Sequence, residues 1–238
     1  MKPAVLFFLL FVGGRWCAHA GPVELQSGPA RVALIELYSS EGCSSCPPAE
    51  RWLGQLRDAP GLWRDFVPVA LHVDYWNRLG WPDRFSSRAN TQREYAYAAA
   101  WHSASVYTPC FVRNGAEWRA EGGALRGDGN PAGLLTVRYD GRTVQATYRP
   151  VAGTAETVYE IHAALLGSGI VSPVTAGENR GETLRHEFVA LALADGAAGT
   201  ALALPRRDVA GVSRYALAVW VTRPGELEPL QAAGGWLP

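Results

Sequence analysis

Two cysteines separated by two serines, Cys43-Ser44-Ser45-Cys46, constrain the fold of this chain more than any other feature. The pair follows Arg31 to Tyr38, a mostly apolar run that is typical of a central strand in a sheet covered on both faces. Pro47 and Pro48 come directly after the pair and are tolerated in the first turn of a helix, where backbone amides have no helical partner. The sequence therefore predicts a strand, a turn that carries the C-x-x-C pair, and a helix that ends near Arg57.

The position of the pair predicts chemistry at sulfur. Free amides and the positive end of the dipole at a helix N-terminus stabilise a thiolate and lower the pKa of the thiol. Because the thiolate is the attacking species in disulfide exchange, Cys43 is the candidate nucleophile. Cys46 lies one helical turn further on and is the candidate resolving thiol, which would attack the mixed disulfide and release the product.

Two other interpretations of the pair stay open. Cysteines of exported proteins are commonly paired in structural disulfides, so the C-x-x-C could be a disulfide that stabilises the fold and has no redox activity. The pair could also supply half of a metal site. A zinc ribbon would need a second C-x-x-C, which the sequence lacks, whereas a softer site with a third ligand would suit Cu(I), which thiolates favour.

The first twenty residues have the pattern of a secretory signal peptide. Lys2 precedes an apolar run from Ala4 to Val12, and Ala18-His19-Ala20 fits a cleavage site. The run is far shorter than the roughly 20 apolar residues that span a bilayer. We expect cleavage after Ala20, which also removes Cys17, and a periplasmic or secreted mature protein with no membrane span.

The composition argues against a nucleic-acid partner. The chain has 22 basic and 22 acidic residues, whereas nucleic-acid-binding domains carry a clear basic excess. Its hydrophobic content of 48% is that of a globular protein with a core, not of a disordered chain.

The sequence contains no G-x-S-x-G nucleophile motif, no Walker motif and no dinucleotide-binding glycine pattern. We therefore expect no cofactor, apart from copper in the metal-binding alternative.

The pattern of expected helices and strands changes near a Gly/Asn/Pro-rich stretch at residues 129–133. Before it, strand-like and helix-like runs alternate, with a strand at Val67–Tyr75 and a helix that starts at a T-x-x-E capping box on Thr91 and continues to Trp101. After it, short apolar runs follow at the spacing of an antiparallel sheet or sandwich. We expect a signal peptide at 1–20, an α/β domain at 21–133 and a β-rich, sandwich-like domain at 134–238.

The strands expected in the second segment begin with a hairpin around Asp140-Gly141, a strong turn signal. Val189–Ala194 is rich in alanine, and its periodicity leaves helix and strand both open. The expected strands are Leu134–Tyr139, Thr143–Tyr148, Thr157–Leu166, Ile170–Val174, Leu184–Leu193, Thr200–Leu204 and Tyr215–Thr222.

Several motifs of the chain occur together in one family. They are Val32–Pro48 (VALIELYSSEGCSSCPP), His72–Trp76 (HVDYW), Gly80-Trp81, Tyr107-Thr108-Pro109, and Gly177–Gly181 (GENRG) with Leu184 and His186. In these motifs the chain resembles a family of secreted bacterial proteins of unknown function with a thioredoxin-like fold, and the resemblance covers most of the sequence. It implies a thioredoxin-like domain with the C-x-x-C at its first helix, and it implies no established substrate. We expect the Gly177–Gly181 turn to tie the two domains together or to cap a loop.

The resemblance also gives Thr108 and Pro109 a role. Thioredoxin-like folds place a cis-proline opposite the C-x-x-C, and a cis bond is inexpensive only before proline. The backbone of Thr108 could then pair with an extended substrate chain. An ordinary trans turn is the alternative. The resemblance also implies a last helix near Trp118–Gly133, although the residues of this stretch have low helix propensity.

Glu36 is an acidic residue inside an apolar strand, where a carboxylate is costly unless it is hydrogen-bonded or protonated. In thioredoxins a buried acid beneath the C-x-x-C takes a proton from the resolving thiol, and Glu36 could serve Cys46 in this way. Its spacing from Cys43 is one residue longer than is usual, and one residue reverses the face of a strand. A carboxylate paired with a neighbouring amide or arginine is the alternative.

Cys110 and His72 are the remaining candidates for chemistry. Loss of Cys17 leaves an odd number of thiols, so Cys110 could approach the pair, act as a further metal ligand, or be a small buried hydrophobe. His72 and Asp74 share a strand face, so His72 could meet a thiolate or a metal with Asp74 orienting it. The metal-binding alternative therefore uses Cys43, Cys46, Cys110 and His72.

These observations favour thiol–disulfide exchange through Cys43 and Cys46, supported by Thr108, Pro109 and Glu36. The expected partner is an extracytoplasmic protein or a small thiol or disulfide substrate. Two alternatives remain: a copper- or other metal-binding protein of thioredoxin-like fold, and a non-catalytic secreted binding module whose disulfide only stabilises the fold.

Overall fold

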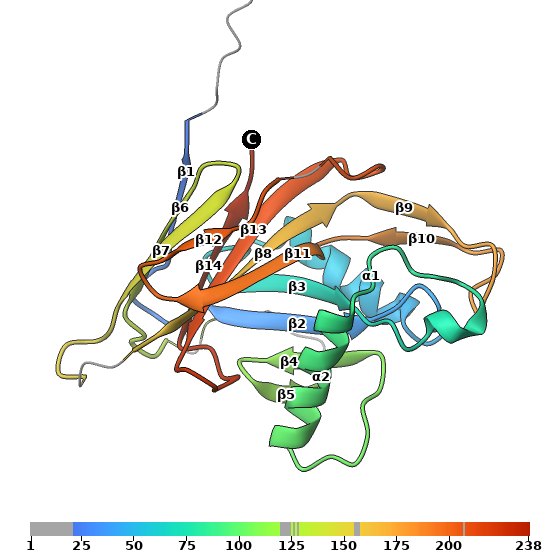
Figure 1. Cartoon of the computed structure of the whole chain (residues 1–238), viewed down its shortest axis with the longest axis horizontal. Coiled ribbons are helices and arrows are strands. Elements are labelled where there is room, and N and C mark those ends of the chain that lie inside the picture. Colours follow the sequence, from blue (N-terminus) through green and yellow to red (C-terminus); the bar gives the residue numbers. More distant parts are fainter. Residues whose placement is uncertain (1–20, 120–124, 126, 128, 155–157, 207) are drawn as a thin grey trace, which may run out of the picture.

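The computed structural model describes residues 21–119, 125, 127, 129–154, 158–206 and 208–238. The expected signal peptide and Cys17 lie outside the described residues. The described chain is a mixed α/β protein with a large mixed sheet, a smaller antiparallel sheet and few helices (Figure 1). A two-stranded ribbon projects beyond the large sheet on the side of the C-x-x-C pair (Figure 1).

The large sheet has eight strands, and strands from both halves of the chain contribute to it. In spatial order they are β14 (Gln231–Trp236), β13 (Arg214–Thr222), β8 (Glu160–Ser168), β11 (Val189–Ala197), β3 (Phe66–His72), β2 (Ala33–Ser39), β4 (Cys110–Arg113) and β5 (Ala116–Trp118). Strands β2 and β3 are parallel, and β4 is antiparallel to β2. Every residue of β2 and β3 is buried, which agrees with the continuous apolar runs that predicted two covered strands.

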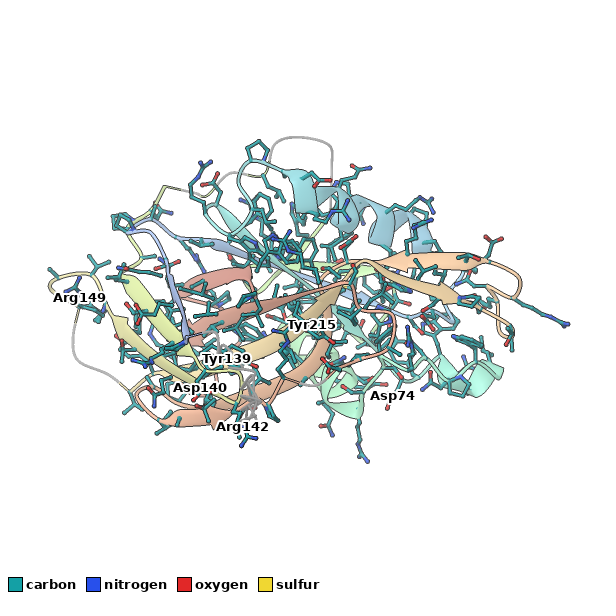
Figure 2. All side chains as sticks on the ribbon, turned by 90° about the horizontal axis from the view of Figure 1, so that it is seen from above. Asp74, Tyr139, Asp140, Arg142, Arg149 and Tyr215 are labelled. Carbon is teal, nitrogen blue, oxygen red and sulfur yellow. A yellow bond between two sulfur atoms is a disulfide. The ribbon has the colours of Figure 1, made fainter. Side chains whose placement is uncertain are left out.

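Two helices bury this central pair from opposite sides (Figures 1 and 2). Helix α1 (Pro47–Gln55) starts with its two prolines, as expected, and is followed by a 3-10 turn at Leu56–Asp58. Helix α2 (Arg88–Ala100) lies on the other face, after a second 3-10 turn at Asn77–Leu79. The expected capping box at Thr91 is wrong, because Ser87 is the N-cap and its side chain accepts a hydrogen bond from the backbone N–H of Asn90.

The second sheet is antiparallel and packs against the β8–β13 part of the large sheet. Its strands are β1 (Val23–Gln26), β6 (Leu134–Tyr139), β7 (Thr143–Arg149) and β12 (Ala201–Ala203). Along β6, Leu135, Val137 and Tyr139 are buried and the residues between them are exposed, which is the period of a half-buried strand. The hairpin at Asp140-Gly141 is confirmed; Gly141 has a φ of 89°, and Figure 2 labels Asp140 at this turn.

The ribbon pairs β9 (Ile170–Pro173) with β10 (Thr183–His186). The single strand expected at Leu184–Leu193 is therefore wrong. The chain breaks at Phe188, which has a φ of 57°, and β10 and β11 join different sheets. Val189–Ala194 lies in strand β11, which settles the choice between helix and strand left open above.

The two expected segments share hydrogen bonds. Strand β11 of the second segment pairs in parallel with β3 of the first through Val189 and Ala70, and β1 of the first pairs with β6 of the second. The division into domains at 21–133 and 134–238 stays a prediction about independent folding. The last helix expected near Trp118–Gly133 falls partly outside the described residues, and those described there form no helix. No helix in the described part of the chain is long and apolar enough to cross a membrane.

Candidate functional site at the Cys43–Cys46 disulfide

Cys43 and Cys46 form a disulfide between the end of β2 and the start of α1. Their Cα atoms are 5.5 Å apart, and Cys46 is the N-cap residue of α1. Two backbone hydrogen bonds close the turn, from Cys43 N to Ser40 O at 3.1 Å and from Cys46 N to Cys43 O at 3.2 Å. The expected order of strand, C-x-x-C turn and helix is confirmed.

The Thr108–Pro109 peptide bond is cis, as the resemblance implied, and it lies beside Cys43. The Cys43 Sγ atom is 3.8 Å from the carbonyl oxygen of Thr108. The hydroxyl of Ser45 lies between them, 3.3 Å from Cys43 Sγ and 3.4 Å from that carbonyl oxygen. The indole N–H of Trp76 donates to the Thr108 hydroxyl at 2.8 Å and helps to hold this loop.

Both halves of the disulfide are buried. Cys43 is 0% exposed and Cys46 is 1% exposed, whereas Ser44 and Ser45 between them face solvent. Disulfide exchange requires that an attacking thiolate reach one of the two sulfur atoms. In this oxidised form, an attacking group must therefore first displace part of the surrounding loop.

A second loop holds the C-x-x-C turn in place. The Gly177–Gly181 turn joins β9 to β10, and both of its glycines have the positive φ that such a turn requires. The Asn179 side chain donates to the carbonyl oxygens of Glu41 and Cys43, and the Glu178 carboxylate accepts from the backbone N–H and the hydroxyl of Ser44. The expectation that this turn caps a loop is confirmed, and the loop is the one that carries the cysteines.

Glu36 lies on β2 and its carboxylate is engaged on the α2 side of the sheet. Arg93 Nε donates to Oε1 at 2.7 Å and the Tyr97 hydroxyl donates to Oε2 at 2.6 Å, both from α2. These are the contacts of a buried acid paired with arginine. No contact between Glu36 and Cys46 is found among the described residues, so its role as a proton acceptor stays a prediction.

His72 takes part in a buried group of charges that lies behind α1. Its Nδ1 is 2.6 Å from Asp83 Oδ2, and its Nε2 is 3.3 Å from Glu50 Oε1. Burial alone would lower the pKa of His72, but the carboxylates of Asp83 and Glu50 outweigh it and hold that pKa well above its usual range. Asp74, expected to orient His72, instead accepts a hydrogen bond from Thr91.

His186 of β10 completes this group, which we call the buried His–carboxylate cluster: Glu41, Glu50, His72, Asp83 and His186. His186 lies 3.2 Å from Glu41 Oε1 through Nε2 and 3.4 Å from Glu50 Oε2 through Nδ1. Burial favours a protonated Glu50, but the close approach and charges of His186 and His72 lower its pKa below the usual range. The carboxylate of Glu50 therefore bridges both imidazoles.

Cys110 is a free, buried cysteine at the start of β4. Burial raises the pKa of its thiol to about 12. Glu94 and Tyr107 are among the groups that act on it, whereas Cys43 and Cys46 are bonded to each other. Within the described part of the chain, the converging group of possible metal ligands is Glu50, His72 and His186, and none of the three cysteines belongs to it.

The sequence profile of the family described as "Protein of unknown function (DUF1223)" matches residues 34–222. The chain belongs to the DUF1223 family. No curated protein matches it.

Two solved structures share the fold of this DUF1223 protein. The crystal structure of AGR_C_4864 from Agrobacterium tumefaciens is 24% identical with a TM-score of 0.60, and the match covers 89% of this chain and 96% of that one. HBP35 of Porphyromonas gingivalis is 12% identical with a TM-score of 0.52, and the match covers 89% of this chain and 76% of that one. At these identities the likeness concerns the fold alone.

Sequence reasoning missed most of the cluster in this DUF1223 protein. Glu50 follows Cys46 by four residues, so the two occupy one face of α1, which was a usable signal. Asp83 lies in a loop, and the motif that contains His186 was noted through the family resemblance without a chemical role. Nothing in the spacing of these residues indicates that the ribbon brings His186 to α1.

Proposed function

We propose that this DUF1223 protein is an extracytoplasmic thiol–disulfide oxidoreductase that acts through Cys43 and Cys46. The observation that carries the proposal is the disulfide at the N-cap of α1, with Cys43 Sγ facing the carbonyl of Thr108 beside a cis-proline. The strand order β3-β2-β4-β5, with β3 parallel to β2 and then two antiparallel strands, supports a thioredoxin-like core around this site. The second sheet and the ribbon are additions to that core.

The chemistry follows from the positions of the two sulfurs. In the reduced form, the thiolate of Cys43 attacks one sulfur of a substrate disulfide, and the other substrate sulfur leaves as a thiolate. Cys46 then attacks Cys43 in the mixed disulfide, so the substrate leaves reduced and the Cys43–Cys46 bond reforms. Two electrons pass from the pair to the substrate, and the reverse sequence oxidises a substrate dithiol.

The surroundings support an extended protein substrate or a small disulfide. The carbonyl of Thr108 lies next to Cys43, so a substrate chain that pairs with this backbone would bring its disulfide to the nucleophile. The N-terminal signal pattern supports a periplasmic or secreted location, where protein disulfides persist.

Burial of the disulfide favours a second candidate function. With Cys43 at 0% and Cys46 at 1% exposure, the pair has the environment of a structural disulfide in a non-catalytic extracytoplasmic binding module. A structural disulfide resists reduction by glutathione, whereas a catalytic one has a higher potential and exchanges quickly. The two candidates therefore differ in two measurable quantities.

The test measures the pKa of Cys43 in the reduced protein, the reduction potential of the pair, and the rate of reduction of a protein disulfide such as those of insulin. We expect a Cys43 pKa below the ordinary 8.5 and measurable exchange. Cys46→Ser should trap a covalent mixed disulfide with the substrate, and Cys43→Ser should not. Cys110→Ser is the matched control and should keep full activity. A Cys43 pKa near 8.5 together with no exchange would reject the enzyme and leave the structural disulfide.

A further inference from the structure

Three buried side chains that no exchange step uses meet behind α1. They come from three separate elements: Glu50 from α1, His72 from the end of β3 and His186 from β10. Their exposed fractions are 5%, 0% and 1%. One possible ligand atom of each lies within 4.8 Å of the others. We propose that Glu50, His72 and His186 bind a divalent transition-metal ion such as Zn²⁺, independently of the disulfide.

The distances between the three side chains fit a metal. His72 Nε2 lies 3.3 Å from Glu50 Oε1, and His186 Nδ1 lies 3.4 Å from Glu50 Oε2. Zinc bonds to nitrogen and oxygen are about 2.0–2.2 Å long, so two ligand atoms on a tetrahedral ion are about 3.4 Å apart. The two distances end on different oxygens of Glu50, and one ligand atom of each side chain lies within 4.8 Å of the others, so the side chains must move closer together to bind one ion.

Two polar atoms of the site face each other at 3.3 Å without a hydrogen bond of good geometry. His72 Nε2 and Glu50 Oε1 are buried, and neither makes a hydrogen bond of good geometry among the described residues. A buried polar atom without a partner is costly and calls for an explanation. Both atoms are among the ligand atoms that an ion at this position would engage, and an ion between them would satisfy both.

Two further carboxylates orient the histidines as the outer partners of metal ligands do. Asp83 Oδ2 lies 2.6 Å from His72 Nδ1, and Asp83 is itself fixed by the backbone N–H groups of Glu41 and Phe85, each at 2.9 Å. A proton on Nδ1 that faces Asp83 leaves the lone pair of Nε2 free for an ion.

Glu41 plays the same part for His186. Its Oε1 lies 3.2 Å from His186 Nε2, and its Oε2 accepts a hydrogen bond of 2.8 Å from the Trp81 indole. His186 is thus free to use Nδ1 toward the ion. Each of the two imidazoles has one nitrogen on a carboxylate and the other toward Glu50.

The charges of the cluster also favour a cation. Three carboxylates, Glu41, Glu50 and Asp83, surround two imidazoles. With neutral imidazoles, buried negative charge is left that a divalent ion would largely offset. Two protonated imidazoles would offset the same charge without an ion, and this is the competing arrangement that the experiment separates.

A cavity gives an ion a path to the site. A pocket of about 430 Å³ opens between α1 and the ribbon, and Glu50, His186 and Cys46 are among the residues that line it.

Imidazole and carboxylate ligands suit Zn²⁺ and its neighbours better than the soft Cu(I) that thiolates select. The disulfide sulfurs carry no thiolate, so they take no part in this site.

The experiment uses the whole chain, stripped with a chelator and dialysed. Zn²⁺ binding is measured by competition with a chromophoric chelator and by elemental analysis, and Co²⁺ is added as a spectroscopic probe. We expect one ion per chain and visible Co²⁺ bands of a four- or five-coordinate site without thiolate charge-transfer absorption. Absence of stoichiometric binding to the wild-type chain overturns the proposal, because it leaves the doubly protonated histidines as the explanation of the cluster.

Variants locate the site and separate it from the disulfide. His72→Gln and His186→Gln should each weaken Zn²⁺ binding by at least about 100-fold, and Asp83→Asn, which leaves the three ligands in place, should weaken it about 10–100-fold. His162→Gln, at a histidine of β8 outside the cluster, is the control and should bind normally. The Cys43→Ser/Cys46→Ser variant should also bind one ion. Loss of binding there but not in His72→Gln assigns the metal to the cysteines and overturns the proposal, whatever the outcome of the exchange assay.

Discussion

The side-chain amide of Asn179 donates a hydrogen bond of 2.9 Å to the carbonyl oxygen of Cys43, across 136 positions of the sequence. The same nitrogen donates to the carbonyl oxygen of Glu41 at 2.8 Å, and Asn179 is buried. The turn of the ribbon that contains Asn179 thus holds the backbone of the loop that carries the disulfide. Because both cysteines are buried, we expect the mobility of this loop to limit how fast a reductant reaches the disulfide.

Asn179→Ala should loosen the C-x-x-C loop. The change removes a donor from two buried carbonyl oxygens, of which that of Cys43 keeps the hydrogen bond from Cys46 N–H, so the free energy of unfolding should fall by about 1–3 kcal/mol. The same change should raise the rate at which a phosphine reductant opens the Cys43–Cys46 bond severalfold, because local opening becomes easier. Urea denaturation gives the first quantity and a thiol-release assay gives the second.

Arg180→Ala is the control for this prediction, since Arg180 is exposed in the same turn. It should change neither quantity. Equal reduction rates in wild type and Asn179→Ala would show that the ribbon does not limit access to the disulfide.

The parts of the fold that the sequence predicted depend on contacts close in the chain. Strands β2 and β3 follow from unbroken apolar runs, and α1 follows from Pro47 and Pro48. Strand β14 was missed because its sequence, QAAGGW, has no β-branched residue; it forms by pairing with β13. Intrinsic propensity gave no signal where the partner strand decides the structure.

The same limit holds for the candidate site, because only the residues that lie in local motifs were predicted. The C-x-x-C and Thr108–Pro109 were found because local motifs mark them. The cap of α2 was misplaced because Thr91 has the right residue type, yet its hydroxyl hydrogen-bonds to Asp74 instead. His186 and Glu50 lie in elements that are far apart in sequence, and only the placement of the ribbon brings them together. Patterns along one chain carry no information on that placement.

Arg93→Leu should be strongly destabilising. Arg93 forms the ion pair with fully buried Glu36, so its removal leaves a buried carboxylate without a counter-charge. The expected loss in the free energy of unfolding is about 3–5 kcal/mol. Adding Glu36→Leu should recover part of this loss because no unpaired charge then remains. Urea denaturation of the two single variants and the double variant measures the coupling, and additive effects would contradict the pairing.

Glu94→Gln should stabilise the protein at neutral and higher pH. Burial raises the pKa of the Glu94 carboxyl to about 7, and neither carboxylate oxygen makes a hydrogen bond of good geometry among the described residues. The folded state therefore holds its proton to higher pH than the unfolded state, where the pKa is about 4.5. Stability should fall as the pH rises from about 4.5 to about 7 and then level off.

The glutamine variant lacks this ionisation, so its advantage over wild type should grow across the same interval and reach about 1–3 kcal/mol at pH 8. Thermal unfolding at a series of pH values measures the difference. Glu24→Gln, at an exposed glutamate of β1, is the control for the removal of one carboxylate. A constant difference between Glu94→Gln and wild type from pH 4 to pH 8 would contradict the raised pKa.

Cys110 should be inert in the folded protein. Its thiol is 2% exposed and burial raises its pKa to about 12, so at pH 8 roughly one part in ten thousand is thiolate. Alkylation of the Cys110 peptide, followed by mass spectrometry, should be at least about a hundredfold slower in native protein than in urea. Cys110→Ala should leave the potential of the Cys43–Cys46 pair unchanged. Rapid labelling of Cys110 in native protein, or a shifted potential, would instead make it a third thiol of the exchange site.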